Sequence, residues 1–322
     1  VWNTSHSIGA GLVVILCGYI MGTVGMNMTA DPDAVATIAA NLGVAPDDAA
    51  GMERVMASAT HVGAWKWCFW VPSAIAFAGA IGLVVFLRDT PSSVGLPELK
   101  TGKTTGQQPQ TRAEENAEYK AFLRRKVFLN PTIWIIAVGN FFVYVVRFAV
   151  LDWGPTMLKE HLHMDISLAG WSVAAFEIAG IAGMLAAGWA TDRLFGGRAP
   201  RTCVVCMSMA ALCLAGFYAL DRETPLAVAV AILMAAGFFI YGPQALVGIA
   251  AANIATKRAA ATAGGFCGLF GYGSTVVSGW GLGLLVQRTG WNAALSALIG
   301  AAVIGTAIFA LAWRARPNGY DD

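Results

Sequence analysis

A single arginine stands inside an apolar run that has the length of a membrane helix. The run extends from Pro131 to Leu151, and its one full charge is Arg147. These 21 residues would form a helix of roughly 31 Å, enough to cross the hydrocarbon core of a bilayer. A charged side chain inside such a helix costs at least about 2.5–3.5 kcal/mol. We therefore expect a compensating partner, and an anion held in a water-filled cavity would supply one.

The guanidinium group also indicates which anion to expect. Its planar fork of donors binds phosphate through two parallel hydrogen bonds. The first hypothesis is therefore a membrane protein that handles a phosphate-bearing solute. Two other interpretations stay open from the residues alone: Arg147 could extend to the outer lipid headgroups, or it could pair with Asp152.

The composition places the chain among all-α, polytopic membrane proteins. It is 57% hydrophobic and 12% charged, with a mean hydropathy of +0.61, whereas soluble domains are about 25% charged. Only helices and closed barrels satisfy their backbone in lipid, and these runs are too long and continuous for barrel strands. The sequence contains no basic run with interleaved aromatic residues and no nucleophile–base pair. We expect no nucleic-acid partner, no enzymatic activity, no cofactor and no metal.

Eight apolar segments can be counted, at about 4–28, 67–87, 131–151, 168–190, 202–219, 225–250, 260–286 and 291–313. Between the first two, residues 29–66 are acidic and alanine-rich, and we expect an external loop with one or two short helices, or else a disordered insertion. Residues 89–130 are polar and read as a linker that ends in a short surface helix. Of the 21 Lys and Arg residues, 15 fall on the side of this linker and the C-terminus and five on the other side. The linker and the C-terminus are therefore expected in the cytoplasm.

Two helices before a long cytoplasmic linker and six after it predict a transporter with two halves. The six helices would form one complete half, and the two helices would be part of the other half. Transporters of the major facilitator superfamily have two six-helix halves, with the solute site between them near the midplane of the membrane. We expect residues 1–88 to be the remnant of an N-terminal half, its first four helices missing. Residues 131–316 would form the six-helix C-terminal half, and 317–322 a tail.

Six stretches, spread over almost the whole chain, resemble the organophosphate:phosphate antiporter family of that superfamily. They are Trp-Asn-Thr-Ser-His-Ser-Ile-Gly-Ala-Gly (2–11), Arg-Asp-Thr-Pro-Ser-Ser-Val-Gly-Leu-Pro (88–97), Val-Tyr-Val-Val-Arg-Phe-Ala-Val-Leu-Asp-Trp-Gly-Pro (143–155), Gly-Trp-Ala-Thr-Asp-Arg-Leu-Phe (188–195), Tyr-Gly-Pro-Gln-Ala-Leu-Val-Gly (241–248) and Ala-Gly-Gly-Phe-Cys-Gly-Leu-Phe-Gly-Tyr (263–272). The family includes transporters of glycerol-3-phosphate, hexose phosphates and phosphoglycerate, and a hexose-phosphate sensor. The resemblance implies a location in the bacterial inner membrane and, for the full-length protein, a monomer.

The resemblance also implies which residues bind the substrate. Arg147 corresponds to the family's phosphate-binding arginine of the seventh helix, and His6 to a ligand-contacting histidine of the fifth. Tyr144 and Tyr241 fall at positions that face the cavity. From the residues alone, His6 could instead be a core histidine and Tyr241 an ordinary packing tyrosine.

Four further residues are implied to act in gating rather than in binding. Asp152 and Glu177 resemble acids that exchange salt bridges as the transporter changes state, although Asp152 could be only an interfacial anchor. Asp192 and Arg193 resemble the cytoplasmic loop motif that locks neighbouring helix ends in one conformation.

Small residues at a spacing of four recur in the glycine-rich helix predicted for 264–283. Gly264 and Gly268 form one pair, and Gly279 and Gly283 a second. Because such pairs let helices approach closely, we expect tight helix packing there, without substrate contact.

The expected function is exchange of an organic phosphate for inorganic phosphate by alternating access. The alternative is a sugar-phosphate sensor of the same fold that signals to a membrane kinase, since residues 175–180 and 242–252 look somewhat like the sensor branch. Val276 and Trp280 stand where hexose-phosphate exchangers carry a charged pair, which weakens a simple hexose-phosphate assignment. The sequence leaves the organic phosphate open.

Overall fold

The computed structural model describes residues 32–64, 66–88, 112–162, 166–220 and 224–316, together with a few isolated positions before residue 21 and at 95. Every regular element in this part of the chain is a helix. The chain divides into a unit formed by Ile8–Gln108 and a unit formed by Val1–Ser7 with Pro109–Asp322. His6 and most of the first expected membrane segment lie outside the described residues.

The smaller unit contains three described helices, α2 (Pro32–Leu42), α3 (Ala49–Ala64) and α4 (Trp67–Phe86). The expected loop 29–66 therefore contains two short helices, as the first of its two interpretations predicts. The 20 residues of α4 form a helix that is long and apolar enough to cross a membrane.

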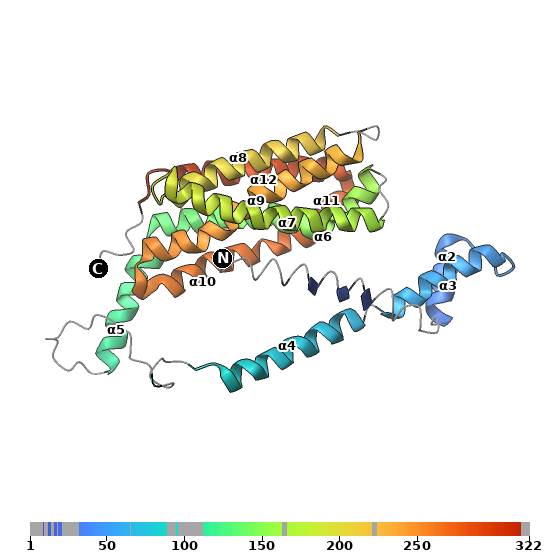
Figure 1. The fold of residues 1–322 in the computed structure, drawn as a ribbon, viewed down its shortest axis with the longest axis horizontal. Helices are drawn as coiled ribbons and strands as arrows, with labels where there is room; N and C mark the ends of the chain where they lie inside the picture. Colours follow the sequence, from blue (N-terminus) through green and yellow to red (C-terminus); the bar gives the residue numbers. More distant parts are fainter. Residues whose placement is uncertain are drawn as a thin grey trace. The chain divides into compact units, whose positions relative to one another are not determined.

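The larger unit is a bundle of long helices that run roughly side by side (Figure 1). Its members are α6 (Pro131–Leu162), α7 (Ile166–Arg193), α8 (Ala199–Tyr218), α9 (Leu226–Ala255), α10 (Ala260–Gly273), α11 (Leu282–Thr289) and α12 (Trp291–Leu311). With α4, the described residues contain seven candidate membrane spans, because α10 and α11 belong to one span, Lys257–Thr289. Seven of the eight apolar segments predicted from the sequence are thereby confirmed as helices.

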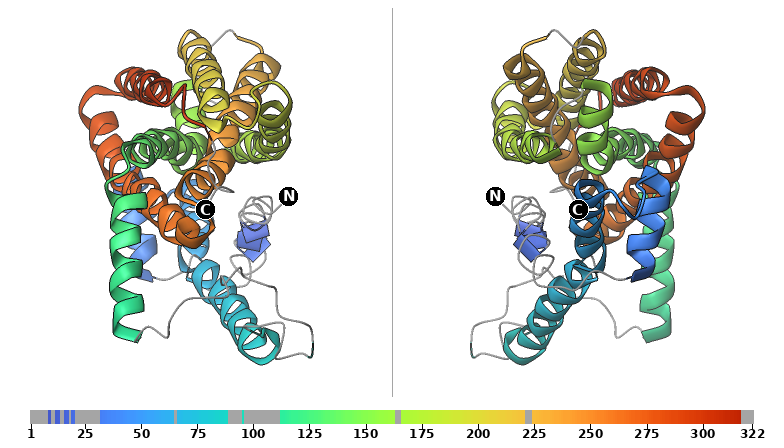
Figure 2. Two further views of the ribbon diagram at one scale, coloured as in Figure 1. Left: turned by 90° about the vertical axis from the view of Figure 1, so that its left-hand side faces the viewer. Right: turned by 90° about the vertical axis from the view of Figure 1, so that its right-hand side faces the viewer.

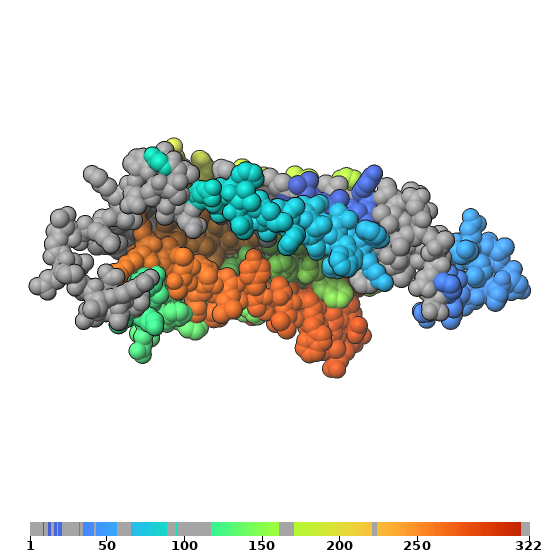
Figure 3. Space-filling view, turned by 90° about the horizontal axis from the view of Figure 1, so that it is seen from below, coloured from blue at the N-terminus to red at the C-terminus, as the bar shows by residue number. Residues whose placement is uncertain are grey.

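The segment predicted at 260–286 is not one regular helix. It begins after a short 3₁₀ turn, η3 (Lys257–Ala259), and a five-residue π-helix, η4 (Val277–Gly281), separates α10 from α11. Glycines concentrate around the interruption, and their lack of a side chain lowers the preference for regular helix. Figure 3 shows α10, η4 and α11 as a continuous orange strip. Val276 and Trp280, at the interruption, are exposed over 63% and 74% of their surface.

Glycine brings the backbones of α7 and α9 into direct contact. A Cβ atom at Gly183 would lie 1.9 Å from the carbonyl oxygen of Phe238, and one at Gly237 would lie 2.4 Å from that of Phe176. Since only glycine fits at such a distance, these two positions fix how closely and in which register the two helices pack. This contact brings Glu177 of α7 within reach of Tyr241 of α9.

The prediction of tight packing at the two other glycine pairs is wrong for three of the four residues. A Cβ atom at Gly264, Gly268 or Gly279 would meet no described atom within 4 Å, and only Gly283 packs closely, against the Trp153 ring at 2.9 Å. Sequence spacing identifies a stripe of small residues but not the neighbour that it faces. On α10 that stripe borders a cavity instead of a helix.

The expected surface helix at the end of the linker is α5 (Arg112–Leu123), which continues into the π-helix η2 (Arg124–Phe128). It extends from one end of the bundle (Figure 2, green). Arg258 holds it there: its guanidinium carbon lies 5.4 Å from the ring centroids of both Tyr119 and Phe122, and its Nη1 lies 3.9 Å from Glu118 Oε1. The Tyr119 hydroxyl donates to the Arg258 carbonyl oxygen at 3.3 Å. These contacts tie α5 to the turn between α9 and α10.

Gly183→Ala is expected to destabilise the bundle, because the new methyl group would overlap the Phe238 carbonyl oxygen and push α7 away from α9. Overpacking of this kind costs roughly 1–3 kcal/mol. The thermal unfolding midpoint in detergent measures the effect. Gly300→Ala is the matched control, since a Cβ atom there meets nothing within 4 Å. Equal midpoints for the two variants would contradict the packing described.

Arg258→Ala is expected to release α5 without unfolding the bundle. Exposed cation–π contacts contribute about 0.5–1 kcal/mol each and a surface ion pair about 0.2–1 kcal/mol, so hydrogen exchange of the 112–123 amides should accelerate about tenfold. Arg288→Ala serves as the control, because Arg288 lies in the last turn of α11, far along the chain from this contact. Unchanged exchange in α5 would show that other contacts hold it.

Candidate anion-binding site

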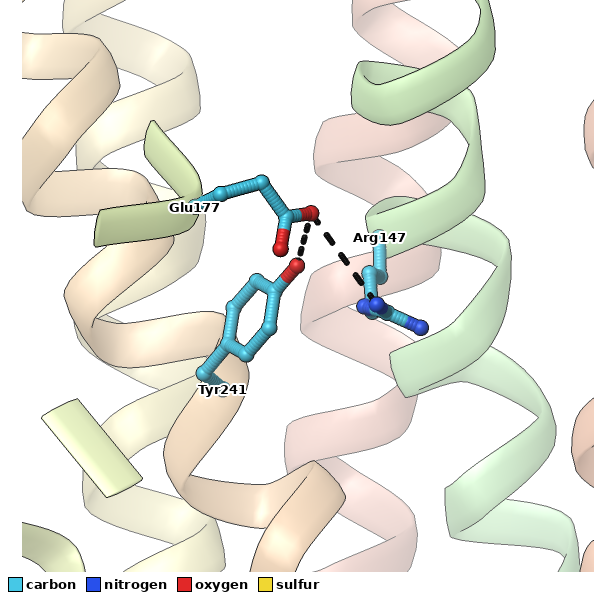
Figure 4. A network of polar contacts seen from close by, with 3 residues as sticks. All are labelled: Arg147, Glu177 and Tyr241. Carbon is cyan, nitrogen blue, oxygen red and sulfur yellow. Dashed lines mark hydrogen bonds and ion pairs between the residues drawn. The ribbon is translucent and has the colours of Figure 1, made fainter. Parts of the chain in front are cut away.

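Three helices of the bundle bring Arg147, Glu177 and Tyr241 together (Figure 4). Arg147 of α6 is only 1% exposed, and its Nη2 lies 3.9 Å from Oε1 of Glu177 on α7. The same Oε1 accepts a hydrogen bond from the hydroxyl of Tyr241 on α9. The Arg147 guanidinium carbon lies 4.8 Å from the centroid of the Tyr241 ring. Arg147 therefore does not extend to the lipid headgroups, and its ion-pair partner is Glu177 rather than Asp152.

Local packing fixes Tyr241 in this orientation. Its ring lies against Gly180, where a Cβ atom would come within 2.6 Å of the ring carbons. Phe176 meets the same ring edge to face, with 5.7 Å between centroids. Gly180 and Glu177 are three residues apart on α7 and so share a helix face. The close approach at Gly180 therefore sets the position of the Tyr241 hydroxyl next to the Glu177 carboxylate.

The cluster leaves several polar atoms without a partner among the described residues. Arg147 Nε and Nη1 and Glu177 Oε2 are buried and accept or donate no hydrogen bond. The 3.9 Å contact between Arg147 and Glu177 is itself too long for a hydrogen bond. A buried charge that lacks hydrogen bonds is expensive. Arg147 thus keeps donors that the described residues do not use, and such donors are the groups of a guanidinium that an anion binds.

A cavity of about 610 Å³ lies in the same bundle, and its lining does not include the three residues of the cluster. Residues of α6, α7, α9 and α10 line it, and their polar side chains are Asn140, Tyr144 and Gln244. Tyr144 precedes Arg147 by three residues on α6, and Gln244 follows Tyr241 by three on α9, so each pair shares a helix face. The cluster therefore lies one helical turn beyond the part of the cavity that these two residues line.

The remaining predicted site residues lie in different surroundings. Tyr144 lines the cavity, where its ring packs against Phe148 at 5.5 Å and Tyr272 at 5.7 Å. Tyr241 is fully buried beside Glu177 and does not line the cavity. Asp152 is exposed on α6, and the ion pairs found among the described residues do not include it.

Asp192 and Arg193, which the sequence predicts to act in gating, are exposed at the end of α7 and are absent from the same ion pairs. The turn that follows is held by other groups. The hydroxyl oxygens of Thr191 and Thr202 lie 2.7 Å apart in a buried contact between α7 and α8. Gly196 and Gly197 adopt positive φ angles of 57° and 77°.

Sequence reasoning missed Asn140 and Gln244. Both are buried, with 3% and 7% of their surface exposed, and each has a side-chain oxygen without a partner among the described residues. The available signal was a carboxamide inside an otherwise apolar run, and Gln244 also falls in one of the stretches that carry the family resemblance, residues 241–248. A neutral amide costs far less to bury than a charge, and so it attracts less attention.

Comparisons with known proteins identify relatives over most of the chain. It is 30% identical over 98% of its length to a probable hexose phosphate transport protein of Chlamydia pneumoniae, of which it covers 63%. It is 34% identical over 77% of its length to the glycerol-3-phosphate transporter of Bacillus subtilis, of which it covers 56%. Two further relatives are the membrane sensor protein UhpC of Escherichia coli (30% identical; 90% and 57% covered) and the hexose-6-phosphate:phosphate antiporter of Salmonella typhimurium (32%; 73% and 52%). The resemblance to organophosphate transporters is thereby confirmed, and the chain spans somewhat less than two thirds of the length of these relatives.

A solved structure matches the fold. It is the crystal structure of a bacterial homologue of the human lysosomal transporter Spinster in an inward-facing, unoccupied conformation, with a TM-score of 0.54 and 16% identity. The match covers 78% of this chain and 59% of that one. The family model described as Major Facilitator Superfamily matches residues 1–279 and 154–321. The chain is a multi-pass inner-membrane protein that belongs to the Major Facilitator Superfamily.

Proposed function

We propose that the protein exchanges an organic phosphate for inorganic phosphate across the inner membrane by alternating access, with Arg147 as the phosphate ligand. The observation that carries this proposal is a buried guanidinium with two unpartnered nitrogens, one turn beyond a cavity of about 610 Å³. Relatives named as glycerol-3-phosphate and hexose phosphate transporters, and as a hexose-6-phosphate:phosphate antiporter, support it.

Competition for Arg147 gives the cluster a way to sense its ligand. A phosphate that enters from the cavity offers oxygens that bind the guanidinium in a planar, two-pronged manner. Glu177 contacts Arg147 at only 3.9 Å, so phosphate displaces it, while Tyr241 continues to hold the carboxylate. The empty and loaded states then differ in the partner of Arg147, which is the differential interaction that a ligand needs to shift a conformational equilibrium.

The same proposal includes the orientation of the protein in the membrane and the roles of the other predicted site residues. With the linker 89–130 and the C-terminus in the cytoplasm, the cavity faces the cytoplasm, because it lies near the start of α6 and the ends of α7 and α9. Residues 131–316 act as one half of the transporter and 1–88 as part of the other. His6 and Tyr144 contact the ligand, while Asp152, Asp192 and Arg193 act in gating.

A sensor is the second candidate, because the chain is 30% identical over 90% of its length to the membrane sensor protein UhpC. Counterflow of labelled inorganic phosphate into liposomes that carry the native protein separates the two functions. An exchanger accumulates label against unlabelled phosphate inside the liposomes. A sensor binds the ligand without moving it.

Arg147→Lys should weaken the binding of inorganic phosphate to the native protein roughly ten- to hundredfold. Lysine keeps the charge but loses the two-pronged geometry, and a hydrogen bond to a charged group contributes about 1.5–3 kcal/mol. Titration in detergent measures the affinity, and Arg288→Lys is the control substitution. Unchanged affinity in a variant that unfolds at the normal temperature would remove Arg147 from the site.

Glu177→Gln should have the opposite effect on affinity. The amide removes the negative charge that competes with phosphate for Arg147, so phosphate should bind about tenfold more tightly, a change of about 1.4 kcal/mol. The empty protein should meanwhile lose stability, since a buried cation without its partner is costly. Phosphate would then raise the thermal midpoint further than it does in the unaltered protein. Weaker phosphate binding in this variant would argue that Glu177 supports the anion site instead of competing for it.

A further inference from the structure

Two buried carboxamides of the cavity have no assigned role in phosphate binding. Asn140 and Gln244 line the cavity from α6 and α9, and Asn140 Oδ1 and Gln244 Oε1 lack hydrogen-bond partners among the described residues. An unpartnered buried acceptor normally costs about 1–3 kcal/mol. Two such acceptors on the wall of one cavity indicate that something which enters the cavity supplies the missing donors.

The Asn140 side chain is held in place by a contact with α10. Its Nδ2 donates to the carbonyl oxygen of Cys267 at 3.0 Å, and a Cβ atom at Gly271 would come within 2.7 Å of the same nitrogen. Glycine at 271 therefore makes room for this hydrogen bond. With the nitrogen used by the protein, the amide has only its oxygen left to offer to a ligand.

The chemistry of the lining restricts what the cavity accepts. A carbonyl oxygen binds a group that carries a proton, such as a hydroxyl, and repels a carboxylate or phosphate oxygen. None of the described side chains that line the cavity is charged. The volume of about 610 Å³ falls in the range of small-molecule sites.

We infer that Asn140 and Gln244 bind the hydroxyl groups of the substrate, a phosphate monoester whose organic part is polyhydroxylated and carries no charge of its own. Arg147 binds the phosphoryl group one turn away, and the two carboxamides select the rest of the molecule. This inference rests on the proposed function and extends it. It favours a glycerol phosphate or a sugar phosphate over a phosphorylated carboxylic acid such as 3-phosphoglycerate.

The first test uses the unaltered native protein and four kinds of ligand. Affinities are measured for inorganic phosphate, glycerol-3-phosphate, glucose-6-phosphate and 3-phosphoglycerate. The tighter of the two polyol phosphates is then compared with its hydroxyl-free counterpart, propyl phosphate or cyclohexyl phosphate. We expect the polyol phosphate to bind at least tenfold more tightly than its counterpart and than 3-phosphoglycerate. Equal affinity for the polyol phosphate and its counterpart, or tighter binding of 3-phosphoglycerate, would overturn the inference.

The second test assigns the selectivity to one of the two residues, Gln244. Gln244→Met keeps the length of the side chain but removes its oxygen acceptor. It should weaken the binding of the polyol phosphate about five- to tenfold. The affinities for propyl phosphate and inorganic phosphate should stay within about twofold of their original values. Ser208→Ala is the control, because the Ser208 hydroxyl donates to Val204 in its own helix.

Different results would contradict the role of the carboxamides and the proposed function. Gln244→Met could weaken the binding of the polyol phosphate and of propyl phosphate equally, or leave both affinities unchanged. In either case the amide would have no selective role and the inference would be wrong. If the unaltered protein bound no inorganic phosphate at all, the proposed function itself would be wrong, and this inference with it.

Discussion

The buried charge of Arg147 is the constraint on which the rest of this structure depends. A guanidinium in the middle of an apolar helix is costly unless neighbouring groups compensate its charge. Only 1% of the surface of Arg147 is exposed. In the bundle, α7 and α9 pack closely on each other through glycines at 183 and 237, whose replacement would cause backbone clashes. Their residues Glu177 and Tyr241 contact Arg147 of α6. The charge of Arg147 is only partly compensated, because the Glu177 carboxylate lies 3.9 Å away and two guanidinium nitrogens have no partner among the described residues. Under the proposed function, an anion supplies the missing partner.

Under the proposed function and the inference that extends it, two groups of polar residues share the recognition of a ligand. Arg147, in its cluster with Glu177 and Tyr241, binds the phosphoryl group, and the neutral carboxamides of Asn140 and Gln244 bind the organic part. Separating the two has a physical advantage. In the proposed exchange, inorganic phosphate needs only the cluster, so the same arginine serves both ligands, while the cavity distinguishes one organic phosphate from another.

The sequence was informative about the membrane segments and about charge, and much less so about contacts. Long apolar runs predict membrane helices by length and composition alone, and an arginine inside one predicts a site because burial of its charge is so costly. Apart from an anion, the sequence analysis considered only Asp152 and the headgroups as partners of Arg147. It did not foresee Glu177, since that pairing depends on which helix faces meet. For the same reason the glycines at 264 and 268 were assigned to packing and instead border the cavity. Asn140 and Gln244 passed unnoticed because neutral amides leave only a weak mark on hydropathy.

The measurement that tests the central claim most directly is a structure of the native protein determined with saturating phosphate, or with tungstate as a heavier analogue that is easier to locate. The account predicts density for the anion within hydrogen-bond distance of the Arg147 guanidinium, with the Glu177 carboxylate withdrawn from it and still bound by the Tyr241 hydroxyl. If the anion were absent from this position, and Arg147 kept Glu177 as its partner at saturating ligand, the cluster would be a structural ion pair and the account would be wrong.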